Sequence, residues 1–156
     1  MSEISTDSRY YLAVVNMAPL KPDADPRELA NFKAAADPFM SRVQSSNPAL
    51  RAFVDPRESN LGSGIFSDNE TFTNLTVWET QQDLLLFLQE AHQTVFRRYR
   101  ELFAPIGQAA VALWWTPAEH TPDFTEAEEH LLKLREVGPT EYAFDFTTAV
   151  NFPAPS

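Results

Sequence analysis

Residues 109–115 read Ala-Ala-Val-Ala-Leu-Trp-Trp, a stretch that is apolar at odd and even positions alike. This composition predicts a β-strand, and successive side chains of a strand point to opposite faces of a sheet. Residues 10–17 show the same two-sided apolar character. Both faces of the sheet that holds these strands therefore have to be covered.

The elements on either side of this strand predict the fold. In chain order the sequence predicts a strand at residues 10–17, a helix after Asp25, strands at residues 50–54 and 72–79, a helix from Thr80 towards Phe103, and a strand at residues 109–115. This βαββαβ order is that of the ferredoxin-like fold, an α+β architecture with an antiparallel sheet. We expect one such domain at residues 9–156, preceded by a flexible or disordered segment at residues 1–8.

The remaining local signals concern breaks in the pattern and the C-terminal tail. Pro38 lies inside the first helix and predicts a kink or two short helices, because proline lacks the N–H that the helix needs. Residues 55–70 contain proline and glycines and predict a long, mobile loop. Residues 125–128 have a capping-box sequence that would open a C-terminal helix. Residues 142–146 alternate as a last edge strand or arm would.

The second face of the sheet can be covered in two ways. In a βαββαβ unit both helices lie on one face, so the other face needs a separate cover. An isologous sheet-to-sheet contact with a second copy would provide it, and we expect such a homodimer, a dimeric α/β barrel. The alternative is that the C-terminal helix covers this face within the same chain.

Composition and charge limit the classes of protein to which the chain can belong. The 156 residues are 44% apolar and 22% charged, which is typical of one globular domain. The 22 acidic residues against 12 basic ones give a net charge of −10, so we expect neither nucleic acid nor a membrane as a partner. The first eight residues are polar and lack the apolar core of a signal peptide, so we expect a cytoplasmic protein. There is no cysteine, and the 3 histidines lack the spacing of metal ligands, so no metal site is predicted.

The second helix carries the most informative candidate residue. At about 100° per residue its apolar side chains form one arc from Leu84 to Phe103, and His92 falls in the middle of that arc. An imidazole there would face the sheet or a cavity, and its burial without a partner would cost about 1–3 kcal/mol. His92 is therefore either a hydrogen-bonded core residue or a pocket residue. Asn16, at the end of an otherwise apolar strand, either bonds loop backbone or places an amide in the cavity.

Other side chains give weaker signals for a pocket. Arg98 lies near the edge of the arc and is either solvated or an anion-binding group at the pocket mouth, while Tyr99 belongs to the arc itself. Trp78 and Trp114 are either core residues or aromatic walls of the pocket. Trp114 and Trp115 point to opposite faces, so at most one of them lines a pocket between sheet and helices.

Motifs of well-known chemistry are missing from the sequence. There is no glycine-rich phosphate loop, no G-x-S-x-G elbow and no paired-carboxylate arrangement. The 4 glycines are too few for a loop that cradles a nucleotide. The motifs therefore predict no cofactor.

Several segments resemble a largely bacterial domain family of unknown function. They are Thr76-Val77-Trp78-Glu79, Ala91-His92, Arg97 to Phe103, Leu113 to His120, Leu134-Arg135, Gly138-Pro139-Thr140, Ala143 to Phe146 and Phe152 to Pro155. The resemblance covers nearly the whole chain. One departure is Glu119, which stands where that family usually has glycine.

That family is similar to the dimeric α/β-barrel superfamily, which includes antibiotic-biosynthesis monooxygenases and haem-degrading monooxygenases. The haem degraders use an asparagine late in the first strand, a tryptophan in the second helix and a histidine at the end of that helix. Asn16 and His92 match the first and the third of these residues. Phe87 stands in the place of the tryptophan, which puts haem degradation in doubt and leaves room for a haem-free pocket.

Three functions stay open from the sequence. The first is a cofactor-independent monooxygenase on an aromatic, phenolic substrate, with His92 as base, Asn16 at the developing oxyanion, and Phe87 with Trp78 or Trp114 around the ring. The second is haem binding, with His92 as the axial ligand. The third is a non-catalytic dimer that binds a small apolar or aromatic ligand, as a regulator or a scaffold.

Overall fold

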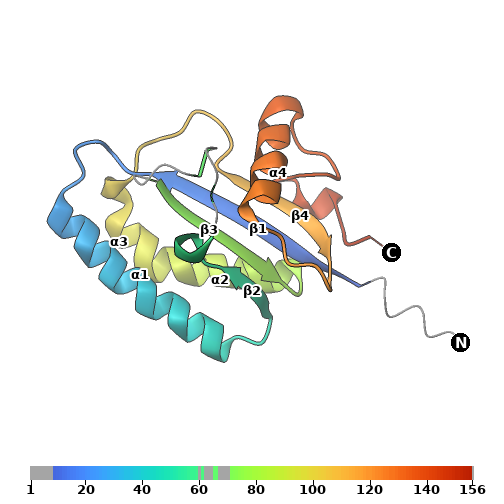
Figure 1. Ribbon diagram of the computed structural model, residues 1–156, viewed down its shortest axis with the longest axis horizontal. Helices are drawn as coiled ribbons and strands as arrows, with labels where there is room; N and C mark the ends of the chain where they lie inside the picture. Colours follow the sequence, from blue (N-terminus) through green and yellow to red (C-terminus); the bar gives the residue numbers. More distant parts are fainter. Residues whose placement is uncertain (1–8, 60, 62–64, 67–70, 156) are drawn as a thin grey trace, which may run out of the picture.

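The computed structural model describes residues 9–59, 61, 65–66 and 71–155, and these contain the predicted βαββαβ core (Figure 1). The strands are β1 (Tyr10–Pro19), β2 (Leu50–Val54), β3 (Thr71–Trp78) and β4 (Val111–Pro117). They form one antiparallel sheet in the order β2-β3-β1-β4. This is the ferredoxin-like order, so the predicted α+β fold class is confirmed. The segment predicted to be flexible at the N-terminus lies outside the described residues, as does much of the predicted mobile loop.

One face of the sheet is covered by α1 (Pro26–Ser46) and α2 (Gln81–Ala91), which lie below it in Figure 1. Phe32 of α1 and Leu84 of α2 are each 1% exposed. Both belong to one apolar core with Trp78 of β3, which is fully buried. Burial of these large side chains is the main stabilising contribution in this layer.

Helix α1 runs as a single helix through Pro38, so of the two predicted alternatives the pair of short helices is wrong and the kink stays a prediction. Pro38 is exposed, and Phe32 and Phe39 anchor the helix to the core on either side of it. This packing outweighs the roughly 3 kcal/mol that proline costs inside a helix. The helix begins as predicted at Asp25, whose carboxylate accepts a hydrogen bond from the Arg27 N–H at 2.9 Å.

The second predicted helix is not one regular α-helix. After α2 the chain forms a π-helical segment, η3 (His92–Phe96), followed by the short turn α3 (Arg97–Tyr99) and the 3-10 turn η4 (Arg100–Leu102). In η3 the Arg97 N–H donates to the carbonyl of His92, five residues back. π-helical segments widen a helix locally and occur frequently at functional sites.

The opposite face of the sheet is covered by α4 (Phe124–Val137), which lies above it in Figure 1. Phe124 and Leu131 of this helix are at most 1% exposed and pack in a second apolar core with Val15 of the sheet. Phe66, from the connection between β2 and β3, is buried in the same core. Its ring lies edge-on to that of Phe124, with 5.5 Å between the centroids.

The same chain therefore covers both faces of its sheet, which is the second of the two alternatives that the sequence left open. A homodimer was expected because one apolar face of the sheet needed a cover from outside the βαββαβ unit. Since α4 covers that face, this reason for a homodimer no longer holds. The homodimer itself stays a prediction, which sedimentation equilibrium at micromolar concentration would decide.

Helix α4 has well-defined ends. Asp123 and Glu126 form its capping box, because the side chain of each accepts a hydrogen bond from the backbone N–H of the other. The box predicted at residues 125–128 is therefore wrong, and the helix begins earlier. Gly138 ends the helix with φ 81°, a backbone conformation that favours glycine.

The C-terminal arm, residues 139–155, wraps around the free edge of β4. Phe144 and Leu113 exchange both backbone hydrogen bonds, at 2.8 and 2.9 Å, in an isolated bridge. Farther along, the Ala149 carbonyl accepts a hydrogen bond from the side-chain amide of Gln81 at 3.0 Å. Residues 142–146 were predicted to form either an edge strand or an arm, and the structure shows an arm. It begins beside α4 and ends beside α2, on the other face of the sheet.

The longest helix, α1, has 21 residues. Within the described ranges, no helix combines the length and the apolar character that crossing a bilayer requires.

Leu131→Ala should lower the free energy of unfolding by about 2–5 kcal/mol, because it removes a fully buried side chain between α4 and the sheet. Leu132→Ala is the matched control. Leu132 is the next residue of the helix but is 42% exposed, and a surface change usually alters stability by no more than about 0.5 kcal/mol. Urea unfolding curves measure both effects, and equal losses would contradict the packing of α4 on this face.

Candidate functional site

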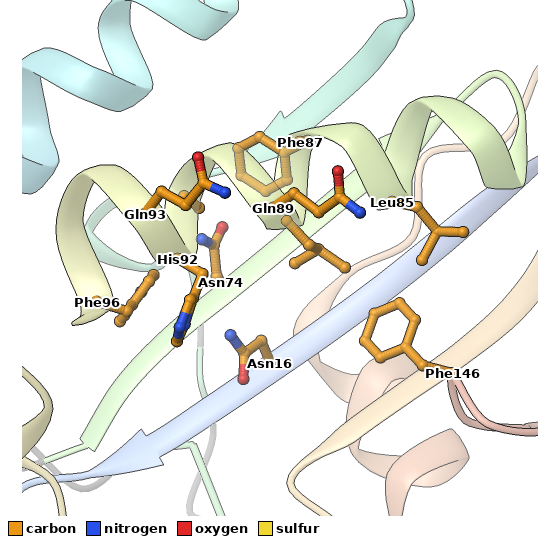
Figure 2. Close-up of a pocket in the computed structure, with 11 residues that line it drawn as sticks. Asn16, Asn74, Leu85, Phe87, Gln89, His92, Gln93, Phe96 and Phe146 are labelled. Atoms are coloured by element: carbon orange, nitrogen blue, oxygen red, sulfur yellow. The ribbon is translucent and has the colours of Figure 1, made fainter.

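A pocket of about 490 Å³ lies between the sheet and the helix that runs from α2 into η3 (Figure 2). The sheet contributes Asn16 from β1 and Asn74 from β3, and the C-terminal arm contributes Phe146. The remaining lining residues belong to α2 and η3: Leu85, Phe87, Leu88, Gln89, Ala91, His92, Gln93 and Phe96. Of the predicted site residues, the pocket thus brings together Asn16, Phe87 and His92.

The floor of the pocket is a pair of asparagines. Asn16 and Asn74 are directly opposite each other in the β1–β3 register. Their side chains therefore leave the same face of the sheet with Cβ atoms about 4.5–5.5 Å apart. Figure 2 shows Asn74 directed towards the helix, and Asn16 directed between His92 and Phe146. Two amide groups thus reach the pocket side by side.

The Asn74 side chain has an unsatisfied acceptor. Its Oδ1 atom is buried, and no donor among the described residues hydrogen-bonds it. A buried acceptor without a partner costs about 1–3 kcal/mol and is uncommon in native structures. Asn74 was not among the site residues predicted from the sequence. The sequence does contain a signal for it, because Asn74 is a polar residue on the same strand face as Phe72 and Trp78.

A smaller recess of about 30 Å³ adjoins the pocket beside the sheet. It shares Asn16 and Asn74 with the pocket and reaches Val14 and Thr76. The Thr76 hydroxyl oxygen accepts a hydrogen bond from the indole N–H of Trp78 at 2.8 Å, so its own hydrogen is available to donate. A cavity needs about 10–15 Å³ to hold one water. The recess therefore admits a group the size of a hydroxyl or an amine, and it is too small for a ring.

Two phenylalanines of the helix form fixed apolar walls. The ring centroid of Phe87 lies 4.7 Å from that of Trp78 and 5.9 Å from that of Phe39. The ring of Phe96 lies 5.7 Å from that of Phe32. Because each wall is backed by close-packed aromatic rings, its orientation is fixed before any ligand binds.

His92 lines the pocket, but the residue is exposed, so the prediction that it faces away from water is wrong. The buried side chains of α2 centre on Leu84, and His92 stands about 80° away on the helical wheel, at the edge of that face. Leu85, which is 44% exposed, had widened the predicted arc towards His92. Within the described part of the chain no group hydrogen-bonds the imidazole.

Three other predicted site residues lie outside the pocket lining. Trp78 is a buried core residue behind Phe87. Tyr99 is 7% exposed and belongs to the same core. Arg98 is exposed, and its guanidinium carbon lies 5.7 Å from the centroid of the Tyr99 ring.

Trp114 lies on the α4 face of the sheet, away from the pocket. Its ring stacks on His130, which in turn stacks on Tyr142, with 4.1 Å between the centroids of each pair. The Nδ1 atom of His130 lies 2.8 Å from the Tyr142 carbonyl oxygen and donates to it. Of the two adjacent tryptophans it is Trp115 that faces the other layer, where its indole N–H donates to the Phe152 carbonyl at 2.9 Å.

Among the described residues, none that lines the pocket is charged. Its eleven lining residues include two asparagines, two glutamines and one histidine, and none is Asp, Glu, Lys or Arg. Among the residues whose placement is described, no three metal-binding side chains come together. A ligand with a full charge would find no counter-ion in the lining, so the pocket suits a neutral molecule.

The stack on the α4 face predicts a pH dependence of stability. Burial lowers the pKa of His130, because the imidazolium form would lose solvation there. The unfolded chain therefore binds this proton more readily. The stability that neutral His130 contributes is complete above the ordinary histidine pKa of about 6.5, and it is lost as the pH falls through the lowered pKa.

The difference in unfolding free energy between wild type and His130→Gln should therefore shrink from about pH 7.5 to about pH 5. Leu132→Ala is the matched control, since it changes an exposed residue of the same helix that does not titrate, and its difference from wild type should not shrink. Chemical unfolding at several pH values measures both. A difference for His130→Gln that is constant with pH would contradict the prediction.

Residues 11–156 match a family described as a domain of unknown function, DUF3291. No curated protein matches the chain. Among solved structures, a conserved protein from Methanosarcina mazei Go1 is 13% identical, with a TM-score of 0.48 over 73% of this chain and 98% of that one.

Two further structures are those of candidate antibiotic biosynthesis monooxygenases. The one from Chloroflexus aurantiacus J-10-fl is 15% identical, with a TM-score of 0.39 over 69% of this chain and 91% of that one. The one from Caulobacter crescentus CB15 is 10% identical, with a TM-score of 0.44 over 72% and 93%. Likenesses this distant carry no argument about activity, so function has to be argued from the pocket.

Proposed function

Because the chain belongs to the DUF3291 family, whose description gives no activity, we propose from its pocket that the protein binds a small, neutral, aromatic molecule. Phe87 and Phe96 would hold the ring, and Asn16 and Asn74 would bind a polar substituent. The observation that carries the proposal is that Asn74 lines a pocket with apolar walls and has a buried Oδ1 to which no described residue donates a hydrogen bond. The volume of about 490 Å³ lies within the usual range for small-molecule sites, about 300–1,000 Å³.

A catalytic form of this proposal makes the protein a cofactor-independent monooxygenase of phenolic substrates. His92 is the one ionisable side chain among the described residues of the lining, so it is the group that would accept the phenolic proton. In this form the reacting oxygen would lie beside His92 and not against Oδ1 of Asn74, and the amide N–H of Asn16 would stabilise it as a phenolate. The electron-rich phenolate would then reduce dioxygen by four electrons in all, so that one oxygen atom becomes a ring carbonyl of the quinone product and the other leaves as water.

The non-catalytic form uses the same pocket without a proton transfer. No carboxylate belongs to the lining, and no group in the described ranges orients the His92 imidazole. A general base is usually oriented by a hydrogen-bond partner. A binding or regulatory protein would need no such partner.

A haem does not fit the lining residues. His92 offers an imidazole for the iron, but the lining contains no Lys or Arg to pair with the two haem carboxylates. The tryptophan of the haem degraders is replaced by Phe87. No chemistry of this chain is therefore derived through haem.

1-Naphthol is a direct probe of the proposed pocket, because it is neutral, bicyclic, fluorescent and carries one hydroxyl group. Its fluorescence should change saturably as it binds. Phe146→Ala should weaken binding about fivefold to tenfold, because it removes apolar surface from the pocket wall. Val150→Ala is the matched control on the same arm, since Val150 is 81% exposed. The absence of saturable binding would contradict the proposal.

Oxygen consumption with a panel of hydroquinones and anthrones separates the enzyme from the binder. For an enzyme, His92→Gln should lower kcat by about 100-fold or more while 1-naphthol still binds, because a general base contributes about 10²–10⁴ to the rate. No oxygen uptake by the wild-type protein across the panel would rule against the catalytic form and leave the binding proposal standing.

A further inference from the structure

We infer that the pocket selects its ligand by an uncharged hydrogen-bond donor, a hydroxyl or a neutral amine, which enters the recess and donates to Oδ1 of Asn74 once a small rotation of the Asn74 side chain turns this buried atom towards it. This inference rests on the proposed function and adds the chemical class that the floor recognises. A ligand of this class has a flat apolar body and one small donor group at its end.

The recess provides complementary partners for such a group. Asn74 offers an acceptor that no protein donor in the described ranges uses. Asn16, directly opposite, and the Thr76 hydroxyl offer donors at the same place. A hydroxyl group both donates and accepts, so it can satisfy Asn74 and receive a hydrogen bond from Asn16 or Thr76. An ether oxygen only accepts and would leave the Asn74 oxygen unpaired.

The size of the recess restricts the group further. A volume of about 30 Å³ next to one of about 490 Å³ separates the ligand into a small polar end and a larger apolar body. The body would lie between Phe87 and Phe96, in the part of the pocket that opens beside His92. A methyl group on the ligand oxygen would compete for the space that the donor needs.

Charge excludes the acidic analogues of the same ring. A carboxylate in the recess would place its negative oxygens against Oδ1 of Asn74, and no Lys or Arg in the lining could compensate. The net charge of −10 adds a long-range repulsion for anions. The floor therefore favours the neutral donor over both the ether and the acid.

Three probes with one ring system test this inference: 1-naphthol, 1-methoxynaphthalene and 1-naphthoate. Wild-type protein should bind 1-naphthol at least about tenfold more tightly than either of the others, as measured by fluorescence titration at pH 7, because a satisfied acceptor is favoured over an unpaired one. If neither neutral probe binds, the proposed function fails together with the inference. If both neutral probes bind equally well, the inference alone fails.

The Asn74→Leu variant tests whether Asn74 is the residue that gives the preference for 1-naphthol. Leucine is similar in size and removes the acceptor, so the preference for 1-naphthol over its methyl ether should fall to about threefold or less. A preference that persists in a folded Asn74→Leu variant would overturn the inference. Thr73→Val is the matched control, because Thr73 is buried on the opposite face of the same strand, and the full preference should remain. The wild-type comparison decides the inference even if Asn74→Leu does not fold.

Discussion

The structure depends on one constraint, which is that the central sheet is apolar on both faces and so requires two covers. Helices α1 and α2 cover one face, and α4 covers the other. Because α4 follows β4 in the chain, the polypeptide has to cross after β4 to the face of the sheet opposite α1 and α2. This crossing determines where α4 and the C-terminal arm lie.

The return path of the C-terminal arm follows from the same constraint. Once α4 has ended at Gly138, the arm passes the free edge of β4 through the Leu113–Phe144 bridge. An unpaired edge strand invites association with other chains, and this bridge occupies part of it. The arm then places Phe146 in the pocket. The segment that completes the cover of the sheet is thus also a wall of the candidate site, so binding and the docking of the arm are expected to be coupled.

The parts of this architecture that a sequence expresses locally could be predicted from it. Strand alternation and helix signals indicated the βαββαβ order, and the end of the first strand indicated Asn16 as a pocket residue. Whether an amphipathic C-terminal helix packs on its own sheet is a tertiary property, and the homodimer was favoured without it. Asn74 became recognisable only through the β1–β3 register, which places it opposite Asn16. His92 was displaced from the expected inner face because an exposed leucine shifted the apparent helical phase.

The features that resist prediction are also those where local and global preferences disagree. An amide without a protein partner in an apolar layer costs free energy, and a π-helical segment departs from the regular helix before it. Both occur around one pocket, Asn74 on its floor and His92 at the start of the segment above it. A sequence selected for stability alone would have placed an apolar side chain at position 74, since Phe72 precedes it on the strand face and Trp78 lies on that face beyond Thr76. The conflict is understandable if the acceptor acquires its partner from a bound molecule, because the free energy lost in the unbound protein is then recovered on binding.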